Sequence, residues 1–445
     1  MLLSSLALLL LHPQLDQTIT DDGVWCWFAD PRAVAAGGAI YAGWTSHVGS
    51  IVVGKVAPWG LSPETFTLRE ELQADDHTNP SLLLLPNNRL MAFYSKHSGP
   101  DMFMRETVES VETSIQNWTP ERKLNLNPNA EPPHSGYCYP NPVYLAEEQR
   151  ILMTWRGTEW KPILSWSDNL GRTWTKGKIL FAKEGADPDN RPYIKVAADG
   201  KSRMHFLATD GHPSSEPTNS VYHFYYEMGA FYRADGTQIA TVQTLPVRPE
   251  NCDLVYDGRV ENIRAWIWDV AVSDDGYPVA VYARLPERNH HEYYYARWDG
   301  SRWTDRKITD GGGWFPQTTP GTIESEPYYS GGVVLDHSDP RIVVLSKPNG
   351  GRFEIQRWVT NDYGDTWSSS TLAVPSGYAA VRPVVARGQS NSASYVLWMD
   401  LQRYSHWTNY FGSIKGLWDD RGPLSNQPQP AANRRALSQA LNLHP

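Results

Sequence analysis

The stretch SLLLLPNNRLMAFY (residues 81–94) holds two apolar runs separated by a Pro-Asn-Asn turn, which is the pattern of an antiparallel β-hairpin. Six other stretches repeat this unit of an apolar strand, a short polar or Gly-containing turn, and a second apolar strand. They are AVAAGGAIYAGW (33–44), VYLAEEQRILMTW (143–155), KVAADGKSRMHFLA (195–208), VAVSDDGYPVAVYA (270–283), VVLDHSDPRIVVLS (333–346) and VVARGQSNSASYVLW (384–398). Their turns fall 50 to 75 residues apart, which is the length of one propeller blade with loops of variable size.

Seven hairpins predict an all-β chain folded as a seven-bladed β-propeller. A single small sheet cannot bury both of its faces, and stacking such sheets around an axis buries each face against a neighbour. A β-sandwich and a β-helix are the alternatives. The wide and irregular spacing of the turns disfavours the β-helix.

A second repeat, out of phase with the hairpins, supports the propeller. TNDYGDTW (360–367) matches the Asp-box pattern [ST]-x-D-x-G-x-T-W in full, and SDNLGRTW (167–174) matches it with Asn169 in the Asp position. In this pattern a short polar side chain bonds the turn backbone, Gly supplies an unusual backbone angle, and Trp packs between sheets. The Asp box is therefore expected to stabilise the fold rather than to catalyse a reaction.

The composition agrees with this fold and excludes some partners. The 445 residues include 19 Trp and 23 Tyr, charged residues make up 20%, and no long amphipathic helical pattern occurs. The formal net charge of −9 argues against nucleic acid or an anionic membrane as the partner, because both need a basic surface. A local basic pocket remains compatible with this charge.

The chain is expected to contain one folded domain between two terminal segments. Residues 2–11, LLSSLALLLL, are as long as the apolar region of a signal peptide and too short to span a bilayer. No basic region precedes them and no clear cleavage site follows, so a misannotated start is the alternative to export. We predict a secreted or periplasmic protein with an N-terminal segment (1–19), a propeller domain (20–425) and a polar tail (426–445).

Three cysteines, Cys26, Cys138 and Cys252, are odd in number and far apart, so they do not form a disulfide scaffold. At most one bridge forms. A metal ligand or a plain buried thiol is the other interpretation of each.

Polar residues gather at the ends of successive hairpins. His77 precedes the second hairpin and His97 follows it, with Asp75 and Asp76 on one side and Lys96 on the other. The two ends of an antiparallel pair lie at the same edge of a sheet, so we expect the two imidazoles to lie close together. A surface or structural role for each histidine is the alternative.

The next two hairpins carry similar residues at the same edge. Tyr139 precedes and Arg156 follows the third hairpin, while Arg191, Tyr193 and Lys195 precede or open the fourth. Core aromatic residues and surface ion pairs are the alternative roles. Together these side chains predict a cationic pocket in an acidic protein, and hence an anionic, carboxylated substrate held through Arg contacts.

Other chemistries have less support. The sequence has no Gly-rich phosphate loop, no GxSxG and no HExxH. His212, Cys252, His290 and His291 lack the spacing of a zinc finger, so buried structural roles are the simpler interpretation. Paired carboxylates for glycoside hydrolysis remain open among 49 acidic residues, although none stands at a hairpin end as the His, Tyr and Arg set does.

The chain resembles the BNR-repeat propellers that include ulvan lyases and rhamnose-glucuronate lyases, with some α-L-rhamnosidases on the same scaffold. The matching phrases run along nearly the whole chain. They are GVWCWFADPRAV (23–34), DDHTNPSLL with YSKHSG, YPNPVYL with TWRG, NRPYIKV, TDGHP, AWIWDVAVSDDGYPVAVYA, HEYYYARWDG, YSGGVVLDHSDP and VRPVV.

This resemblance implies a polysaccharide lyase that cleaves L-rhamnosyl-α-1,4-D-glucuronate bonds by β-elimination and leaves an unsaturated uronate. By similarity, His97 and His77 correspond to the two active-site histidines, Tyr139 to a tyrosine that serves as acid or base, and Arg156 to the arginine that neutralises the carboxylate. Arg191 is expected to be a second residue that binds the substrate. We assign His97 as the base, while the division of labour between the histidines stays open, as does the choice between Tyr137 and Tyr139.

The resemblance also bears on cofactors and partners. No cofactor is required for the chemistry, but some of these lyases hold a structural zinc, for which His212, Cys252 and His291 are the candidate ligands. The expected partner is an anionic polysaccharide such as ulvan or a plant gum side chain, with no nucleic acid and no membrane, and the expected state is a monomer. The alternatives are an α-L-rhamnosidase, a sialidase, for which no three-arginine site can be assembled, and a non-catalytic sugar-binding propeller.

Overall fold

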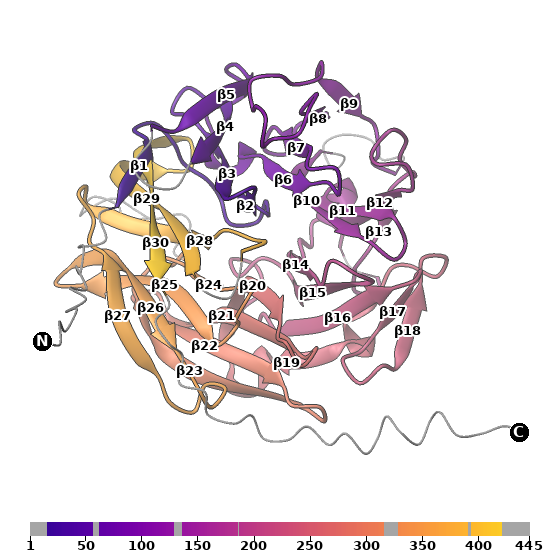
Figure 1. The fold of residues 1–445 in the computed structure, drawn as a ribbon. Helices are drawn as coiled ribbons and strands as arrows, with labels where there is room; N and C mark the ends of the chain where they lie inside the picture. The colour runs from indigo at the N-terminus through magenta and orange to yellow at the C-terminus, as the bar shows by residue number, and fades with distance from the viewer. Residues whose placement is uncertain are drawn as a thin grey trace, which may run out of the picture.

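A computed structural model describes residues 16–56, 62–128, 136–185, 187–315, 328–389 and 393–420. These residues form seven antiparallel sheets. Figure 1 shows the sheets following one another around a ring, in chain order from indigo to yellow. The predicted all-β, seven-bladed propeller is confirmed.

Each blade begins with its innermost strand. Blades 1 to 3 contain β2 (Ala33–Ala36), β3 (Ala39–Thr45), β4 (Ile51–Val56) and β5 (Glu64–Arg69); β6 (Ser81–Leu84), β7 (Leu90–Ser95), β8 (Met102–Glu106) and β9 (Arg122–Leu124); and β10 (Cys138–Leu145), β11 (Arg150–Arg156), β12 (Pro162–Ser167) and β13 (Lys178–Ile179). Blade 4 contains β14 (Ile194–Ala198), β15 (Arg203–Thr209), β16 (Val221–Glu227), β17 (Ala230–Tyr232), β18 (Gln238–Thr241) and β19 (Asp253–Tyr256).

The other three blades complete the ring. They contain β20 (Arg264–Val272), β21 (Pro278–Glu287), β22 (His290–Trp298) and β23 (Trp303–Gly312); β24 (Val333–Leu335), β25 (Ile342–Asn349), β26 (Arg352–Val359) and β27 (Ser368–Ala373); and β28 (Ala379–Val385), β29 (Ala393–His406), β30 (Asn409–Asp420) and β1 (Gln17–Thr20). Four short helical turns lie between strands: η1 (Asp76–Thr78), η2 (Thr158–Trp160), η3 (Pro249–Asn251) and α1 (Gly258–Glu261).

The seven predicted hairpins are the first two strands of the seven blades. In the second blade, β6 and β7 pair from Ser81 with Phe93 to Leu84 with Leu90. Both strands are almost wholly buried, because the inner strands of a propeller are covered on both faces by neighbouring blades. This double burial explains why these strands read as apolar runs instead of alternating with polar residues.

The first and the last of the described strands meet in the seventh blade. β1 pairs antiparallel with β30, so the N-terminal strand supplies the outer edge of a sheet otherwise built from the C-terminal part of the chain. The propeller therefore includes residues 17–20, and the boundary predicted at residue 20 is slightly late. The predicted signal segment up to residue 15 and the tail at 426–445 lie outside the described residues.

Aromatic side chains from the segment between β1 and β2 fill the centre of the ring. We call residues 24–30 the central plug. Trp27 stacks on Trp268 of β20 at 4.4 Å between ring centroids, and Phe28 packs against Tyr193 at 4.6 Å and Trp266 at 5.2 Å. All five rings are buried. The plug therefore packs against the beginning of blade 4 and the inner strand of blade 5.

The two Asp boxes connect the third and fourth strands of their blades. In the first, Asp362 accepts hydrogen bonds from the Thr366 amide (2.8 Å), the Thr366 hydroxyl (2.6 Å) and the Thr360 hydroxyl (2.8 Å). Gly364 has a φ of +102°, and the Trp367 indole donates to its carbonyl at 3.1 Å. In the other box Asn169 makes the corresponding bonds to Ser167 and Thr173. The predicted structural role of the pattern is thus borne out by its contacts.

Replacing Asp362 by Ala should lower the free energy of unfolding by about 1 kcal/mol, because an exposed turn loses three hydrogen bonds that water replaces in part. Turnover should be unchanged, since the box lies at a turn between outer strands. Chemical denaturation of both proteins measures the effect. A loss of turnover with unchanged stability would contradict the structural role.

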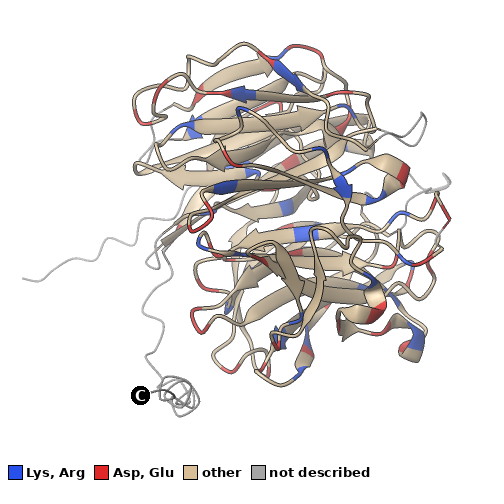
Figure 2. Cartoon of the chain, turned by 90° about the vertical axis from the view of Figure 1, so that its right-hand side faces the viewer, with Lys and Arg blue, Asp and Glu red and all other residues tan. Residues whose placement is uncertain are grey.

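The charged residues are spread over the surface. On the side drawn in Figure 2, basic and acidic residues are interspersed over the blades. Among the described residues, no helix has the length and apolar character needed to cross a membrane. The interspersed charges on that side do not favour a nucleic-acid surface there.

Candidate active site

The hairpins bring the predicted residues to one edge of blades 2, 3 and 4. His77 lies in η1 just before β6, and His97 follows the end of β7. Arg156, the last residue of β11, pairs with Cys138 at the start of β10, next to Tyr139. In blade 4, Tyr193 directly precedes β14 and its carbonyl accepts the Thr209 amide at the end of β15. Antiparallel pairing therefore places all five side chains at the same end of the ring.

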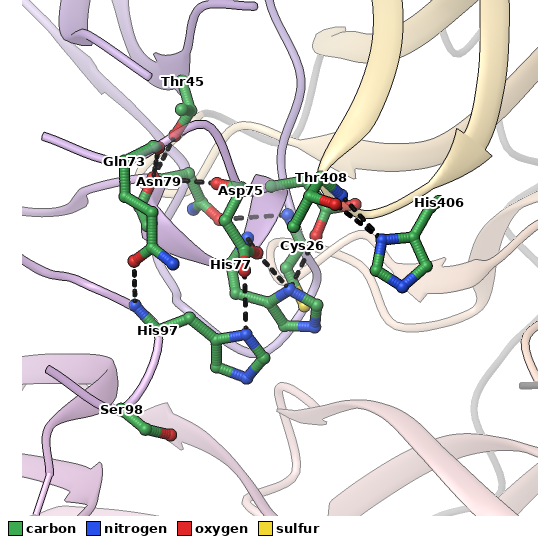
Figure 3. A network of polar contacts seen from close by, with 12 residues as sticks. Cys26, Thr45, Gln73, Asp75, His77, Asn79, His97, Ser98, His406 and Thr408 are labelled. Carbon is green, nitrogen blue, oxygen red and sulfur yellow. Dashed lines mark hydrogen bonds and ion pairs between the residues drawn. The ribbon is translucent and has the colours of Figure 1, made fainter. Parts of the chain in front are cut away.

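His77 and His97 share one carboxylate. Their rings stack at 4.1 Å between centroids, with an interplanar angle of 12°. Nδ1 of His77 donates to Oδ1 of Asp75 at 2.7 Å, and Nδ1 of His97 donates to Oδ2 at 2.9 Å, as Figure 3 shows. Because an ionised carboxylate only accepts, both Nδ1 atoms carry a proton, and the lone pair of a neutral imidazole is then on Nε2.

The two imidazoles differ in charge. Burial opposes a charge on His77, but Cys26 and the carboxylates of Asp76 and Asp75 outweigh it and raise the pKa of His77 well above its ordinary value. For His97, burial and repulsion from the charged His77 lower the pKa to about 4, against the hydrogen bond to Asp75. At neutral pH the pair therefore consists of an imidazolium and a neutral imidazole. Among the described residues, Nε2 of His97 has no hydrogen-bond partner and the side chain is 23% exposed.

A second carboxylate fixes the charged histidine. Oδ1 of Asp76 lies 2.9 Å from Nδ1 of His77, and its Oδ2 accepts from Nη1 of Arg382 at 2.7 Å and from the hydroxyl of Tyr404. Arg382 and Tyr404 come from β28 and β29 of blade 7 and are buried. The histidine pair is thus anchored to blade 7, which restricts its movement.

Tyr139 lies close to both histidines. Its ring centroid is 5.6 Å from that of His77 and 6.2 Å from that of His97. Its φ of +57° is in the left-handed region, which an aromatic residue rarely occupies, and it falls at a β-bulge of β10. Burial and the neighbouring Tyr193 raise the pKa of Tyr139 well above its ordinary value, so the phenol stays protonated. Tyr137 instead accepts the amides of Leu126 and Asn127 through its hydroxyl, so the choice of Tyr139 fits the geometry.

Arg156 lies among aromatic rings. Its guanidinium carbon is 4.7 Å from the centroid of Tyr139, 5.2 Å from Trp160 and 5.4 Å from Tyr193. Nη1 donates to the Tyr193 hydroxyl at 2.5 Å and Nη2 to the Ser98 hydroxyl at 3.2 Å, while Nε has no partner among the described residues. No carboxylate pairs with this buried cation in the described part of the chain, so it can receive one from a ligand.

The three predicted substrate-binding residues have different positions. Tyr193 lines a small pocket beside Arg156, together with Phe28 and Tyr139. Arg191 is half-buried and close enough to His212 to lower its pKa, after the larger effect of burial. Lys195 is fully buried, and its ammonium donates to the Asp30 carboxylate and the Trp27 carbonyl. The substrate-binding role predicted for Lys195 is therefore wrong, because its side chain is used inside the protein.

The proposed zinc ligands do not come together. His212 packs against Tyr193 and Trp266, Cys252 belongs to the core between blades 3 and 4, and His291 lies on β22 in blade 5. Among the described residues, the groups with three clustered donor atoms are Cys26, Asp76 and His77; Asp75, His77 and His97; and His290, Glu292 and Asp310. The predicted set of His212, Cys252 and His291 does not fit a zinc ion, and no step below depends on one.

Four contributors to the site were not predicted as such. Asp75 and Asp76 stand next to His77 in the sequence, but their bridging roles depend on residues far away. Trp160, with a left-handed φ of +57°, packs on Arg156, and Trp407 lies edge-on to His77 at 6.0 Å. The backbone carbonyl of Trp407 also accepts the Asp76 amide at 2.9 Å. The sequence feature that could have indicated Trp160 is that this aromatic residue stands four positions after Arg156.

Comparisons with known proteins agree with this architecture. The chain belongs to the BNR repeat-containing family, whose model matches residues 39–311. A solved polysaccharide lyase, an ulvan lyase bound to -[GlcA(1-4)Rha3S]-, is similar with a TM-score of 0.68 and 13% identity over 90% of this chain and 95% of that one. The BP39L lectin from Burkholderia pseudomallei is similar with a TM-score of 0.52 and 9% identity over 91% and 97%. No curated protein matches the sequence.

These comparisons confirm the predicted resemblance to BNR-repeat propellers that include ulvan lyases. At 13% and 9% identity the solved structures establish the fold and leave the activity to the chemistry of the site.

Proposed function

We propose that the protein is a polysaccharide lyase that cleaves the L-rhamnosyl-α-1,4-D-glucuronate linkage by β-elimination, which breaks the bond between C4 of the glucuronate and O4. The observation that carries this proposal is the unequal histidine pair. A neutral His97 with an unpartnered Nε2 lies beside a charged His77, and both are held by Asp75. The protonated Tyr139 lies next to the pair, and the buried guanidinium of Arg156 packs on the ring of Tyr139.

The first requirement of the reaction is to make the C5 proton of the uronate acidic. Removing this proton builds up negative charge at C5, and the neighbouring carboxylate repels that charge. A guanidinium that binds the carboxylate neutralises it and so lowers the barrier. Arg156 suits this role because it is buried, has no carboxylate partner among the described residues, and keeps Nε unused. The charged His77 adds to the positive potential.

The second requirement is proton transfer. Nε2 of His97 takes the C5 proton, the electrons of the C5–H bond form the C4–C5 double bond, and the C4–O4 bond breaks with its electron pair on O4. Tyr139, whose phenol is protonated, is suited to give O4 its proton. The products are an unsaturated uronate and a free hydroxyl on the departing chain, and no water is consumed.

Incubation with ulvan and with gum arabic tests the proposal. We expect the ultraviolet absorbance of an unsaturated uronate to rise with one or both polymers. Free rhamnose with a saturated glucuronate would instead establish an α-L-rhamnosidase. Binding to either polymer without turnover would favour a sugar-binding propeller, the activity class of the lectin named above.

In a pH profile of kcat/KM, the fall on the acid side (the acid limb) should lie near pH 4. His97 must be neutral to accept a proton, and its pKa is lowered to about 4, so kcat/KM should be constant above this pH and fall as the pH drops through it. A pH profile of kcat/KM on a stable buffer series measures the limb. A limb near the ordinary imidazole value of about 6.5 would mean that His97 is not perturbed as described.

Replacing His77 by Gln should move that acid limb to higher pH. The charge on His77 lowers the pKa of His97, so its removal should raise that pKa towards the ordinary value. The same pH profile, recorded on the variant, checks the sign. An unchanged limb with a lower plateau would show that the two rings do not interact electrostatically.

A further inference from the structure

A small charged pocket lies between the inner strands of several blades and shares no residue with the histidine site. Its charged lining comes from four blades: Asp30 and Arg32 from the plug and the segment before β2, Asp269 from β20, His337 after β24, and Arg387 after β28. Apolar side chains including Val334 and Val384 complete the walls. Residues from blades 1, 5, 6 and 7 thus meet around one small space.

The charges around this pocket do not balance. The carboxylates are Asp30 and Asp269, and the pKa of each is held below its ordinary value by its cationic neighbours against the effect of burial. Three cations face them. Arg32 contacts Asp30 at 3.0 Å, Lys195 forms an ion pair with Asp30, and Arg387 lies 3.9 Å from Asp30 and 3.8 Å from Asp269.

His337 does not remove this surplus. Its Nε2 lies 3.0 Å from Asp269, and protonation of the ring would add a further positive charge. Burial lowers the pKa of Lys195, but the adjacent Asp30 carboxylate, to which it donates, favours the ammonium. Three full cations against two carboxylates leave one positive charge uncompensated in a buried place.

The guanidinium groups also lack acceptors. The Arg32 side chain is 2% exposed; its Nε is bonded to Asp30, and its Nη1 has no hydrogen-bond partner in the part of the chain that the structure describes. Among the described residues, the Arg387 side chain makes one hydrogen bond, to the Val196 carbonyl at 3.3 Å, and it reaches both carboxylates only beyond hydrogen-bond length. A buried charged donor without an acceptor costs free energy, so a missing acceptor is expected beside Arg32.

We propose that this pocket binds one small inorganic anion of halide size, held by Arg32 and Arg387. The space inside suits a single particle about as large as a water molecule, which a halide fits and a sugar or an organic acid does not. The anion completes the charge balance and connects the first blade to blades 5 and 7. Its function is to stabilise the closed ring, independently of any reaction at His97.

Thermal unfolding in sodium chloride and in sodium gluconate of equal ionic strength tests the proposal. Screening is the same in both salts, but gluconate is too large for the pocket. At chloride concentrations ten times the dissociation constant, the Tm of the native protein should be about 2 °C higher than in gluconate. In Arg32→Met the difference should vanish. Arg302→Met, which removes a charge from a side chain that is 79% exposed, is the matched control and should keep it.

Crystals grown in sodium bromide locate the ion directly and do not depend on the stability of any variant. The expected result is a bromide anomalous peak within hydrogen-bond distance of Nη1 of Arg32. A water molecule there at saturating bromide would overturn the proposal. A peak without the chloride-specific rise in Tm would show an adventitious ion only, and a rise that survives in Arg32→Met would place the anion elsewhere. Either result would also overturn it.

Discussion

Replacement of His97 by Ala should lower kcat about a thousandfold, which is within the usual range for the loss of a general base. The C5 proton would then have no acceptor, because the other imidazole, His77, is charged and has Nδ1 between two carboxylates. KM should change little, since His97 acts on the reacting atom and not on the carboxylate. Initial rates of unsaturated product formation measure both constants.

The control for this variant is His290→Ala. His290 is also partly exposed, at 41%, and pairs with a carboxylate, Glu292, but it lies in blade 5 away from the site. Its rate should equal that of the native protein. Turnover within about twofold of native in His97→Ala would remove His97 from the mechanism, because no general base contributes so little.

Replacement of Arg156 by Gln should lower kcat/KM by about a thousandfold, which corresponds to the loss of a buried charge that stabilises the developing negative charge. Gln keeps a hydrogen-bond donor near the hydroxyls of Tyr193 and Ser98, so the site should stay folded. The loss should be far smaller on a substrate whose uronate is methyl-esterified, because esterification already neutralises the carboxylate. Rates on both substrates give the ratio.

The comparison of the two substrates shows whether Arg156 neutralises the substrate carboxylate or only supports the structure of the site. If Arg156 only supported the site, the variant would lose the same factor on both substrates. Equal losses would therefore contradict the assigned role. Arg302→Gln is the control for a general effect of charge, because that side chain is 79% exposed.

The fold was predictable because the hairpins carry local information. The inner strands are apolar on both faces and their turns are polar or contain Gly, so each blade was visible as a unit. The same logic found the site, since antiparallel pairing places the residues before the first strand and after the second at one edge. His77 with His97 and Tyr139 with Arg156 follow from this rule alone.

Contacts between distant segments were not predictable. Lys195 stands two residues after Tyr193, and a strand rises about 3.3 Å per residue, so Lys195 lies further along the strand from the site. There its ammonium pairs with Asp30 of the plug. Nothing in the sequence near Lys195 shows that Asp30 is its partner. The late boundary at residue 20 has the same origin, because β1 is stabilised by pairing with β30 at the other end of the chain.

The protonation states of the histidines also depended on the fold. The sequence left open which histidine moves the proton. The answer follows from the surroundings of His77, where Cys26, Asp76 and Asp75 raise its pKa. Asp76 in turn is fixed by Arg382 and Tyr404, more than 300 residues later in the sequence. His97 is left as the neutral member, and the assignment as base rests on this asymmetry.

The central claim is elimination, and a single-turnover digest in ¹⁸O-labelled water tests it most directly. Elimination breaks the C4–O4 bond without water, so mass spectrometry should find an unsaturated uronate end and no ¹⁸O in either product beyond the exchange seen at reducing ends. One ¹⁸O per cleavage, with a saturated uronate, would show hydrolysis and would contradict the account.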